Sequence, residues 1–217
     1  MLVKTILVGL GLIIAGTGGT LVARAADLEP TAVVARPAAP AVGIVDAFHA
    51  ALLDVMHQGA ALSGEARFRK LAPVVDRTFD LPLMTQVAVG PRWSSLSADQ
   101  QARLIAAFRR FTIANYVNHF DSYDGERFEV DPVAQPINGG KMVLSRLVPR
   151  DHKPVALNYV MRETPYGWRV IDVYAEGKIS ELARRRSEFN AVLAHSGVDG
   201  LADRLVERAQ SLIDQPA

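Results

Sequence analysis

The chain of 217 residues is long enough for one globular domain with a sizeable core, but hardly for two independent domains. Hydrophobic residues make up 49% and charged residues 22%, which excludes disorder over most of the length, and the net charge of +1 gives no reason to expect a nucleic-acid partner. Because the sequence has no cysteine, thiol nucleophiles, thiolate metal sites and disulfides are excluded together.

The N-terminus has the pattern of a secretory signal peptide. Lys4 is followed by an uncharged run over 5–22, and Ala23-Arg24-Ala25 places small residues at the spacing that a signal peptidase recognises. We therefore predict a signal over residues 1–25 and an exported protein. An uncleaved inner-membrane anchor is the alternative, because the uncharged run reaches the lower limit for a membrane-spanning helix.

Residues 26–41 are rich in proline and alanine and show no apolar periodicity. This composition predicts an extended linker. The folded body is expected over residues 42–217, and the linker would let it stand off the membrane whether or not the signal is cleaved.

The first part of the folded body is predicted to be helical. From Ile44 to Met56 apolar residues recur every three or four positions, and a second amphipathic stretch covers 65–79. Asp80-Leu81-Pro82 has the pattern of a cap and first turn, so a short third helix should follow and end at Gly90-Pro91.

Ser97 and Gln100 have the spacing of a capping box, which predicts the start of a fourth helix that runs to Phe120. The apolar residues of this helix cover more than one face. A helix of this kind must contact both the core and something else.

After Asp124-Gly125 the apolar period changes from about four to two, which predicts β-strands. Four alternating segments follow, around 128–130, 142–147, 155–162 and 168–174. Because the turns between them are short, the strands should form an antiparallel meander.

Two further helices are expected after Gly177. The predicted fold class is therefore α+β, with a four-stranded antiparallel meander wrapped against helices on its N- and C-terminal sides. A twisted sheet over helices can enclose a cone-shaped apolar cavity.

The sequence offers little support for catalysis or metal binding. The five histidines lack metal-ligand spacing, since even His49 and His57 lie more than two helical turns apart. No nucleophile elbow and no phosphate-binding loop joins a predicted strand to a helix. We therefore predict no metal, no cofactor and no enzymatic activity.

Asp172 is the one acid on an aromatic-flanked face of the last strand. It could act as a general base on an apolar substrate, or it could fix the sheet against the next helix by pairing with an arginine: Arg146, Arg162 or Arg184. The run of three arginines at 184–186 is either a solvated helix face or a site for an anionic head group.

The segment from Gly167 to Gly177, GWRVIDVYAEG, followed by Ile179-Ser180-Glu181-Leu182 and Arg185-x-x-x-Phe189, resembles the MlaC family, also called toluene-tolerance proteins. The continuation from Tyr174 through Leu182 to Arg184 and Arg185 is closer still to the hopanoid-associated branch. The resemblance implies a periplasmic carrier that holds lipid acyl chains inside its body, and we expect the carrier to be a monomer. It also implies a hopanoid or phospholipid ligand, transport toward the outer membrane and exchange with membrane-bound lipid-transport complexes.

The leading hypothesis is thus a lipid carrier with a cavity between the meander and the helices. The predicted lining residues are Met84, Val87, Phe108, Phe111, Leu144, Leu157, Tyr159, Met161, Trp168 and Val170, and the predicted head-group or mouth residues are Asp172, Arg184 and Arg185. Two other classes remain open. One is an enzyme with Asp172 as general base, and the other is a membrane-tethered assembly factor whose apolar surface docks a partner.

Overall fold

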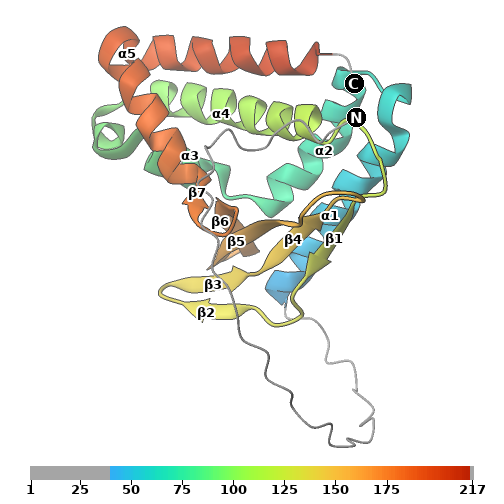
Figure 1. Ribbon diagram of the computed structural model, residues 1–217. Coiled ribbons are helices and arrows are strands. Elements are labelled where there is room, and N and C mark those ends of the chain that lie inside the picture. The colour runs from blue at the N-terminus through green and yellow to red at the C-terminus, as the bar shows by residue number, and fades with distance from the viewer. Residues whose placement is uncertain (1–39, 216–217) are drawn as a thin grey trace, which may run out of the picture.

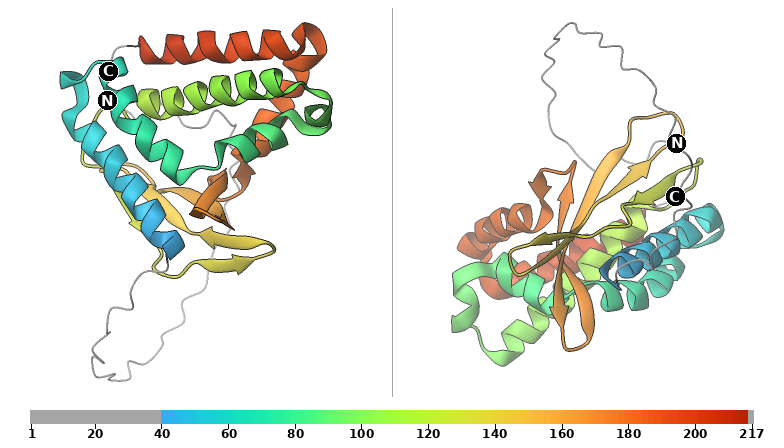
Figure 2. Two further views of the ribbon diagram at one scale, coloured as in Figure 1. Left: turned by 180° about the vertical axis from the view of Figure 1, so that it is seen from behind. Right: turned by 90° about the horizontal axis from the view of Figure 1, so that it is seen from below.

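The computed structural model describes residues 40–215, so the predicted signal and most of the predicted linker lie outside the described residues. Within 40–215, none of the helices combines the length and the hydropathy needed to cross a membrane. The described residues form an antiparallel sheet with helices on one face (Figures 1 and 2).

Four helices precede the sheet: α1 (Pro40–Gln58), α2 (Gly64–Thr78), α3 (Leu81–Val89) and α4 (Ala98–His119). Short 3-10 turns follow α1 and α3, at Gly59–Ala61 and Gly90–Ser95. Helix α1 begins before Ile44, so Pro40 and Ala41 are helical and the side chain of Ala41 is buried.

The helix starts are fixed by the caps that the sequence predicts. Asp80 accepts a hydrogen bond from the backbone N–H of Leu83 at 3.1 Å. Ser97 accepts from Gln100 N–H at 3.2 Å, and the Gln100 side chain accepts from Ser97 N–H at 3.1 Å, which completes the capping box.

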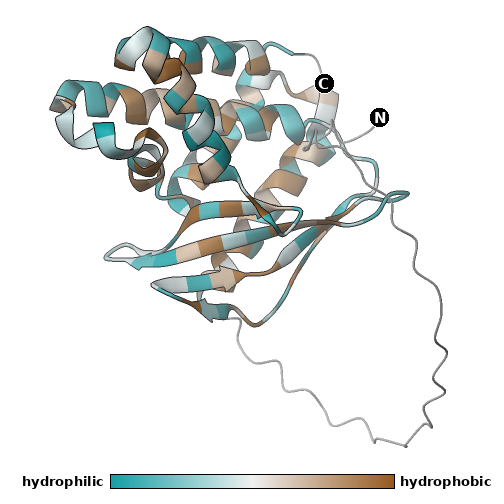
Figure 3. Ribbon diagram, turned by 60° about the vertical axis from the view of Figure 1, so that its left-hand side comes forward, coloured by the Kyte–Doolittle hydropathy of each residue, from teal (hydrophilic) through white to brown (hydrophobic). Residues whose placement is uncertain are grey.

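The sheet has seven strands. They are β1 (Arg127–Val130), β2 (Gln135–Ile137), β3 (Gly140–Val143), β4 (Ser145–Val148), β5 (Val155–Thr164), β6 (Gly167–Ala175) and β7 (Ile179–Ser180). Hydrophobic and hydrophilic residues alternate along the strands (Figure 3).

The predicted meander is present, but β2 and β7 lie outside the predicted segments, and the predicted strand at 142–147 is divided into β3 and β4. Residues 131–134 separate β1 from β2, and only Leu144 separates β3 from β4, while β5 pairs with both of these. Asp131 N–H donates to the Leu144 carbonyl at 2.9 Å across this bulge. A second irregularity between Val160 and Met161 offsets β5 against β6. Bulges increase twist, so the sheet curves around the helices.

The C-terminal helix α5 (Glu181–Ile213) is divided by Gly197, whose φ of 66° and ψ of −168° are not helical. Two helical segments therefore follow the sheet, as the sequence predicts. The second segment runs alongside α4 (Figure 1). The start of α5 thus lies between the last strands and α4.

Candidate functional site

A pocket of about 550 Å³ lies between α4, the inner face of the sheet and α5. Its wall from α3, α4 and the residues flanking them comprises Phe79, Met84, Phe108, Phe111, Thr112, Asn115, Tyr116, His119 and Phe120. Its wall from the sheet comprises Leu157, Tyr159, Val173, Ala175 and Ile179, and α5 contributes Glu181, Leu182, Arg184, Arg185 and Arg208.

The contribution of α4 explains why this helix is apolar on more than one face. Its pocket residues 108, 111, 112, 115, 116 and 119 follow each other at helical spacing and form one stripe. On another side of the helix Leu104, Ile113 and Val117 are fully buried in the core. The expected second contact of α4 is therefore α5 and the pocket.

Tyr116 is held in the pocket wall by other aromatic rings. Its ring lies 5.0 Å from that of Phe48 and 5.7 Å from that of Phe79, and it stacks on Phe120 at 6.1 Å. Burial, together with the carboxylate of Glu181, raises the pKa of Tyr116 well above its ordinary value. The phenol is therefore neutral and can donate a hydrogen bond.

Behind the pocket, the Tyr159 hydroxyl shares a hydrogen bond of 2.9 Å with Nε2 of His49. His49 stacks on Phe128 with ring centroids 4.0 Å apart. Its Nδ1 is buried without a hydrogen-bond partner among residues 40–215. Burial lowers the pKa of His49 to about 3, so the imidazole is neutral.

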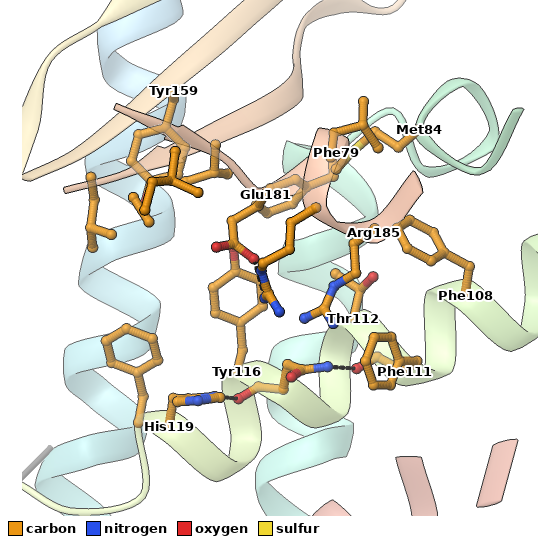
Figure 4. A pocket seen from close by; sticks show the side chains of 18 of the residues that line it. Phe79, Met84, Phe108, Phe111, Thr112, Tyr116, His119, Tyr159, Glu181 and Arg185 are labelled. Atoms are coloured by element: carbon orange, nitrogen blue, oxygen red, sulfur yellow. Dashed lines mark hydrogen bonds and ion pairs between the residues drawn. The ribbon is translucent and has the colours of Figure 1, made fainter. Parts of the chain in front are cut away.

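One side of the pocket is charged. Arg184 bridges Glu181 at 2.5 Å and Glu188 at 2.7 Å, and Arg185 bridges Glu188 at 2.9 Å. The Arg185 guanidinium also lies over the Phe111 ring at 4.7 Å. Burial and the neighbouring Arg184 lower the pKa of Arg185. Figure 4 shows Arg185 between Tyr116 and Phe111, and Glu181 near the hydroxyl end of Tyr116.

Seven of the thirteen residues predicted for the site line this pocket, and their binding role remains a prediction. They are Met84, Phe108, Phe111, Leu157, Tyr159, Arg184 and Arg185.

The structure places the other apolar residues of the predicted lining elsewhere. Val87 lies on an outer side of α3 and is 39% exposed. Met161 and Val170 are fully buried in the hydrophobic core. Leu144 sits at the break between β3 and β4, and Trp168 is half-buried under Lys141, whose ammonium lies 4.9 Å from the ring.

Asp172 lies outside the pocket lining as well, and its partners differ from the predicted arginines. Its carboxylate accepts hydrogen bonds from the Ser180 hydroxyl at 2.6 Å and from the Leu182 N–H at 3.0 Å. It therefore ties β6 to the first turn of α5. The three candidate arginines pair with other acids: Arg146 with Glu129, Arg162 with Asp80 and Arg184 with Glu181.

Sequence reasoning did not assign Tyr116, Glu181 or Arg208 to the site, although the first two had a usable signal. Tyr116 belongs to the same helical stripe as Phe108 and Phe111, and Glu181 precedes the predicted arginines by one turn. Arg208 carries no such signal, because only the fold of α5 at Gly197 brings it back to the pocket. In the described part of the chain, no three acidic or histidine side chains gather as metal ligands would.

Fold and pocket together define an α+β protein that keeps an apolar hollow between its sheet and two of its helices, with arginines at one side. The family model for MlaC proteins matches residues 46–207, which is more than half of the chain. The chain therefore belongs to the MlaC family. The family predicted from the sequence is thereby confirmed.

The fold is similar to a solved structure of the phospholipid-binding protein from Ralstonia solanacearum, determined in complex with a phospholipid. The TM-score is 0.69 at 23% sequence identity, and the match covers 80% of this chain and 99% of that one. The similarity confirms the predicted α+β fold.

Proposed function

We propose that this chain is a periplasmic lipid-binding transport protein. It holds acyl chains or a hopanoid in the pocket and shuttles lipid between membranes, exchanging it with membrane-bound complexes. The observation that carries the proposal is the pocket of about 550 Å³ under the sheet, whose wall is mostly aromatic and aliphatic.

The size of the pocket suits a lipid chain. If a methylene group takes about 30 Å³, the share of one water molecule in the liquid, a chain of about 16 carbons needs roughly 480 Å³. Exposure of such a chain to water costs on the order of 12 kcal/mol, at about 0.8 kcal/mol for each CH₂. An apolar pocket offsets this cost while the lipid crosses an aqueous space.

The charged side of the pocket suits a polar head group. Arg184, Arg185 and Arg208 bring three guanidinium groups to the lining, where Glu181 is the one carboxylate, and Glu188 outside the lining pairs with Arg184 and Arg185. Guanidinium groups bind phosphate oxygens with charge-assisted hydrogen bonds. Asp172 serves this mouth indirectly, because it holds the residues that start α5.

Membership of the MlaC family supports the periplasmic location and the carrier function, and the phospholipid bound to the Ralstonia solanacearum protein supports the ligand class. The alternative of an enzyme with Asp172 as general base is not favoured. The carboxylate lies outside the pocket lining, and both of its oxygens accept hydrogen bonds.

The test is to purify the chain under native conditions, extract bound lipid and identify it by mass spectrometry, and then to measure uptake from labelled vesicles. We expect a bound lipid and rapid uptake. A folded protein that carries no lipid and takes none up would overturn the proposal.

Two tryptophan substitutions make the test specific for the pocket. Thr112→Trp adds an indole to the pocket wall and should reduce uptake at least tenfold. Val87→Trp adds the same group on the outer side of α3 and should leave uptake unchanged. Equal uptake by the two variants would show that lipid binds somewhere else.

A further inference from the structure

The inner wall of the pocket holds two tyrosines in different hydrogen-bonding states. The Tyr159 hydroxyl is engaged by His49 at 2.9 Å. The Tyr116 hydroxyl, by contrast, makes no hydrogen bond within residues 40–215. The Tyr116 side chain is half-buried and lines the pocket, so its hydroxyl is an unused donor that is open to a ligand in the hollow.

The position of Tyr116 within the pocket indicates which part of a bound lipid would lie next to its hydroxyl. On one side it neighbours the rings of Phe79 and Phe120. Toward the other side its phenol extends in the direction of Glu181, next to Arg185 (Figure 4). Tyr116 therefore stands at the boundary between the apolar wall and the charged mouth.

A glycerophospholipid has a polar group at the same boundary, since ester carbonyls join its acyl chains to the head group. An ester carbonyl is a hydrogen-bond acceptor, and the raised pKa of Tyr116 keeps its phenol in the donor form. A hydrocarbon ring system such as the body of a hopanoid offers no acceptor there.

We infer that Tyr116 is a specificity-determining residue whose hydroxyl donates a hydrogen bond to an ester carbonyl of a bound glycerophospholipid. The inference rests on the proposed function and deepens it. It selects an ester-linked lipid over a hydrocarbon ligand, with the acyl chain among the aromatic rings and the phosphate beside Arg184 and Arg185.

The experiment compares two synthetic lipids with the same chains and the same phosphatidylglycerol head group. One is ester-linked, and the other is ether-linked and therefore lacks the carbonyl oxygens. Affinities are measured by competition on the delipidated full chain. The wild-type protein should bind the ester lipid about three- to tenfold more tightly, the range expected for one hydrogen bond.

The Tyr116→Phe variant removes only the hydroxyl and keeps the aromatic packing. It should bind the ether lipid as the wild type does and should lose the preference for the ester lipid. Tyr123→Phe is the control, since it removes the same hydroxyl from a tyrosine that is 42% exposed and lies outside the pocket lining. That variant should keep the ester preference of the wild type.

The outcomes separate the inference from the function on which it rests. A wild type that binds both lipids equally, or a Tyr116→Phe variant that keeps the ester preference, overturns the role of Tyr116 and leaves the carrier function standing. Equal loss of affinity for both lipids in Tyr116→Phe indicates a purely structural role and also overturns it. A wild type that binds neither lipid overturns the proposed function, and the inference falls with it.

Discussion

The inner face of the sheet is covered in two different ways. On the side of α1 the helix packs tightly on the sheet, and its residues Val45, Phe48 and Leu52 are fully buried. On the side of α4 and the start of α5, the same face borders the pocket. One sheet therefore supports both a packed core and a hollow.

The difference follows from the side chains that each helix offers. Helix α1 presents branched and aromatic residues at helical spacing, and these fill the space against the sheet. The start of α5 instead presents Glu181, Arg184 and Arg185, which form ion pairs with one another or with Glu188 and stay partly exposed beside the pocket. The packed side therefore carries the stability, and the open side is available for a ligand.

The largest expected effect comes from breaking the packed side. Phe48 is fully buried and its ring contacts those of Phe79, Tyr116 and Tyr159. Phe48→Ala should lower the free energy of unfolding by about 3–5 kcal/mol, because it leaves an enclosed cavity. The measurement is urea unfolding of the delipidated protein, followed by circular dichroism.

Phe111→Ala is the counterpart on the open side. Phe111 is also nearly buried, at 7% exposure, but its ring borders the pocket. Its removal enlarges an existing hollow, so the loss should be about 2 kcal/mol or less. If both variants lost the same stability, the distinction between a packed and an open side would be wrong.

The next effect concerns the one histidine buried on the packed side. The pKa of His49 is about 3 in the folded protein, below the ordinary value of 6.5, because burial disfavours the charged imidazole. The unfolded chain therefore takes up the proton first, and stability falls as the pH drops below 6.5. Between pH 7 and pH 5 the loss should be about 2 kcal/mol, at about 1.4 kcal/mol for each pH unit below 6.5.

His49→Gln keeps a polar group near the Tyr159 hydroxyl and removes the titration. This variant should be less stable at pH 7 but should show a flatter stability profile between pH 7 and pH 5. His195→Gln changes an exposed histidine of α5 and should keep the wild-type slope. A steep slope that survived in His49→Gln would assign the acid sensitivity to other groups.

The parts of the fold that the sequence predicts well are those decided locally. The caps at Asp80 and Ser97 involve residues three positions apart, and the change from helical to alternating periodicity marks the sheet. The apolar pattern predicts two separate C-terminal helices, and in the structure the kink at Gly197 separates them.

The site is harder to predict because it depends on contacts between distant residues. Alternation shows that Met161, Val170 and Tyr159 share the inner face of the sheet, but it does not show which of them meets a filled interior and which meets a hollow. The hydrogen bond between His49 and Tyr159 joins residues 110 positions apart. The negative charge of Asp172 predicts an arginine partner. In the structure its hydrogen-bond donors are instead the Ser180 hydroxyl and the Leu182 N–H at the start of α5.

The smallest expected effect sharpens the role of the open side. Arg185→Gln removes a guanidinium that lines the pocket and whose side chain is only 19% exposed. Affinity for phosphatidylglycerol should fall about 12-fold, or roughly 1.5 kcal/mol, since one charge-assisted hydrogen bond to phosphate is lost. Binding is measured by uptake from phosphatidylglycerol vesicles at a fixed salt concentration.

Two further variants separate charge in the pocket from charge on the surface. Arg185→Lys retains the cation and should recover part of the affinity, while Arg186→Gln removes an exposed arginine outside the pocket lining and should change little. An equal loss in Arg185→Gln and Arg186→Gln would mean that the lipid senses only the overall charge of α5. A loss of affinity confined to the Arg185 variant would instead show that the arginine in the pocket lining binds the head group. The charged start of α5 would then be the part of the open side that serves the ligand.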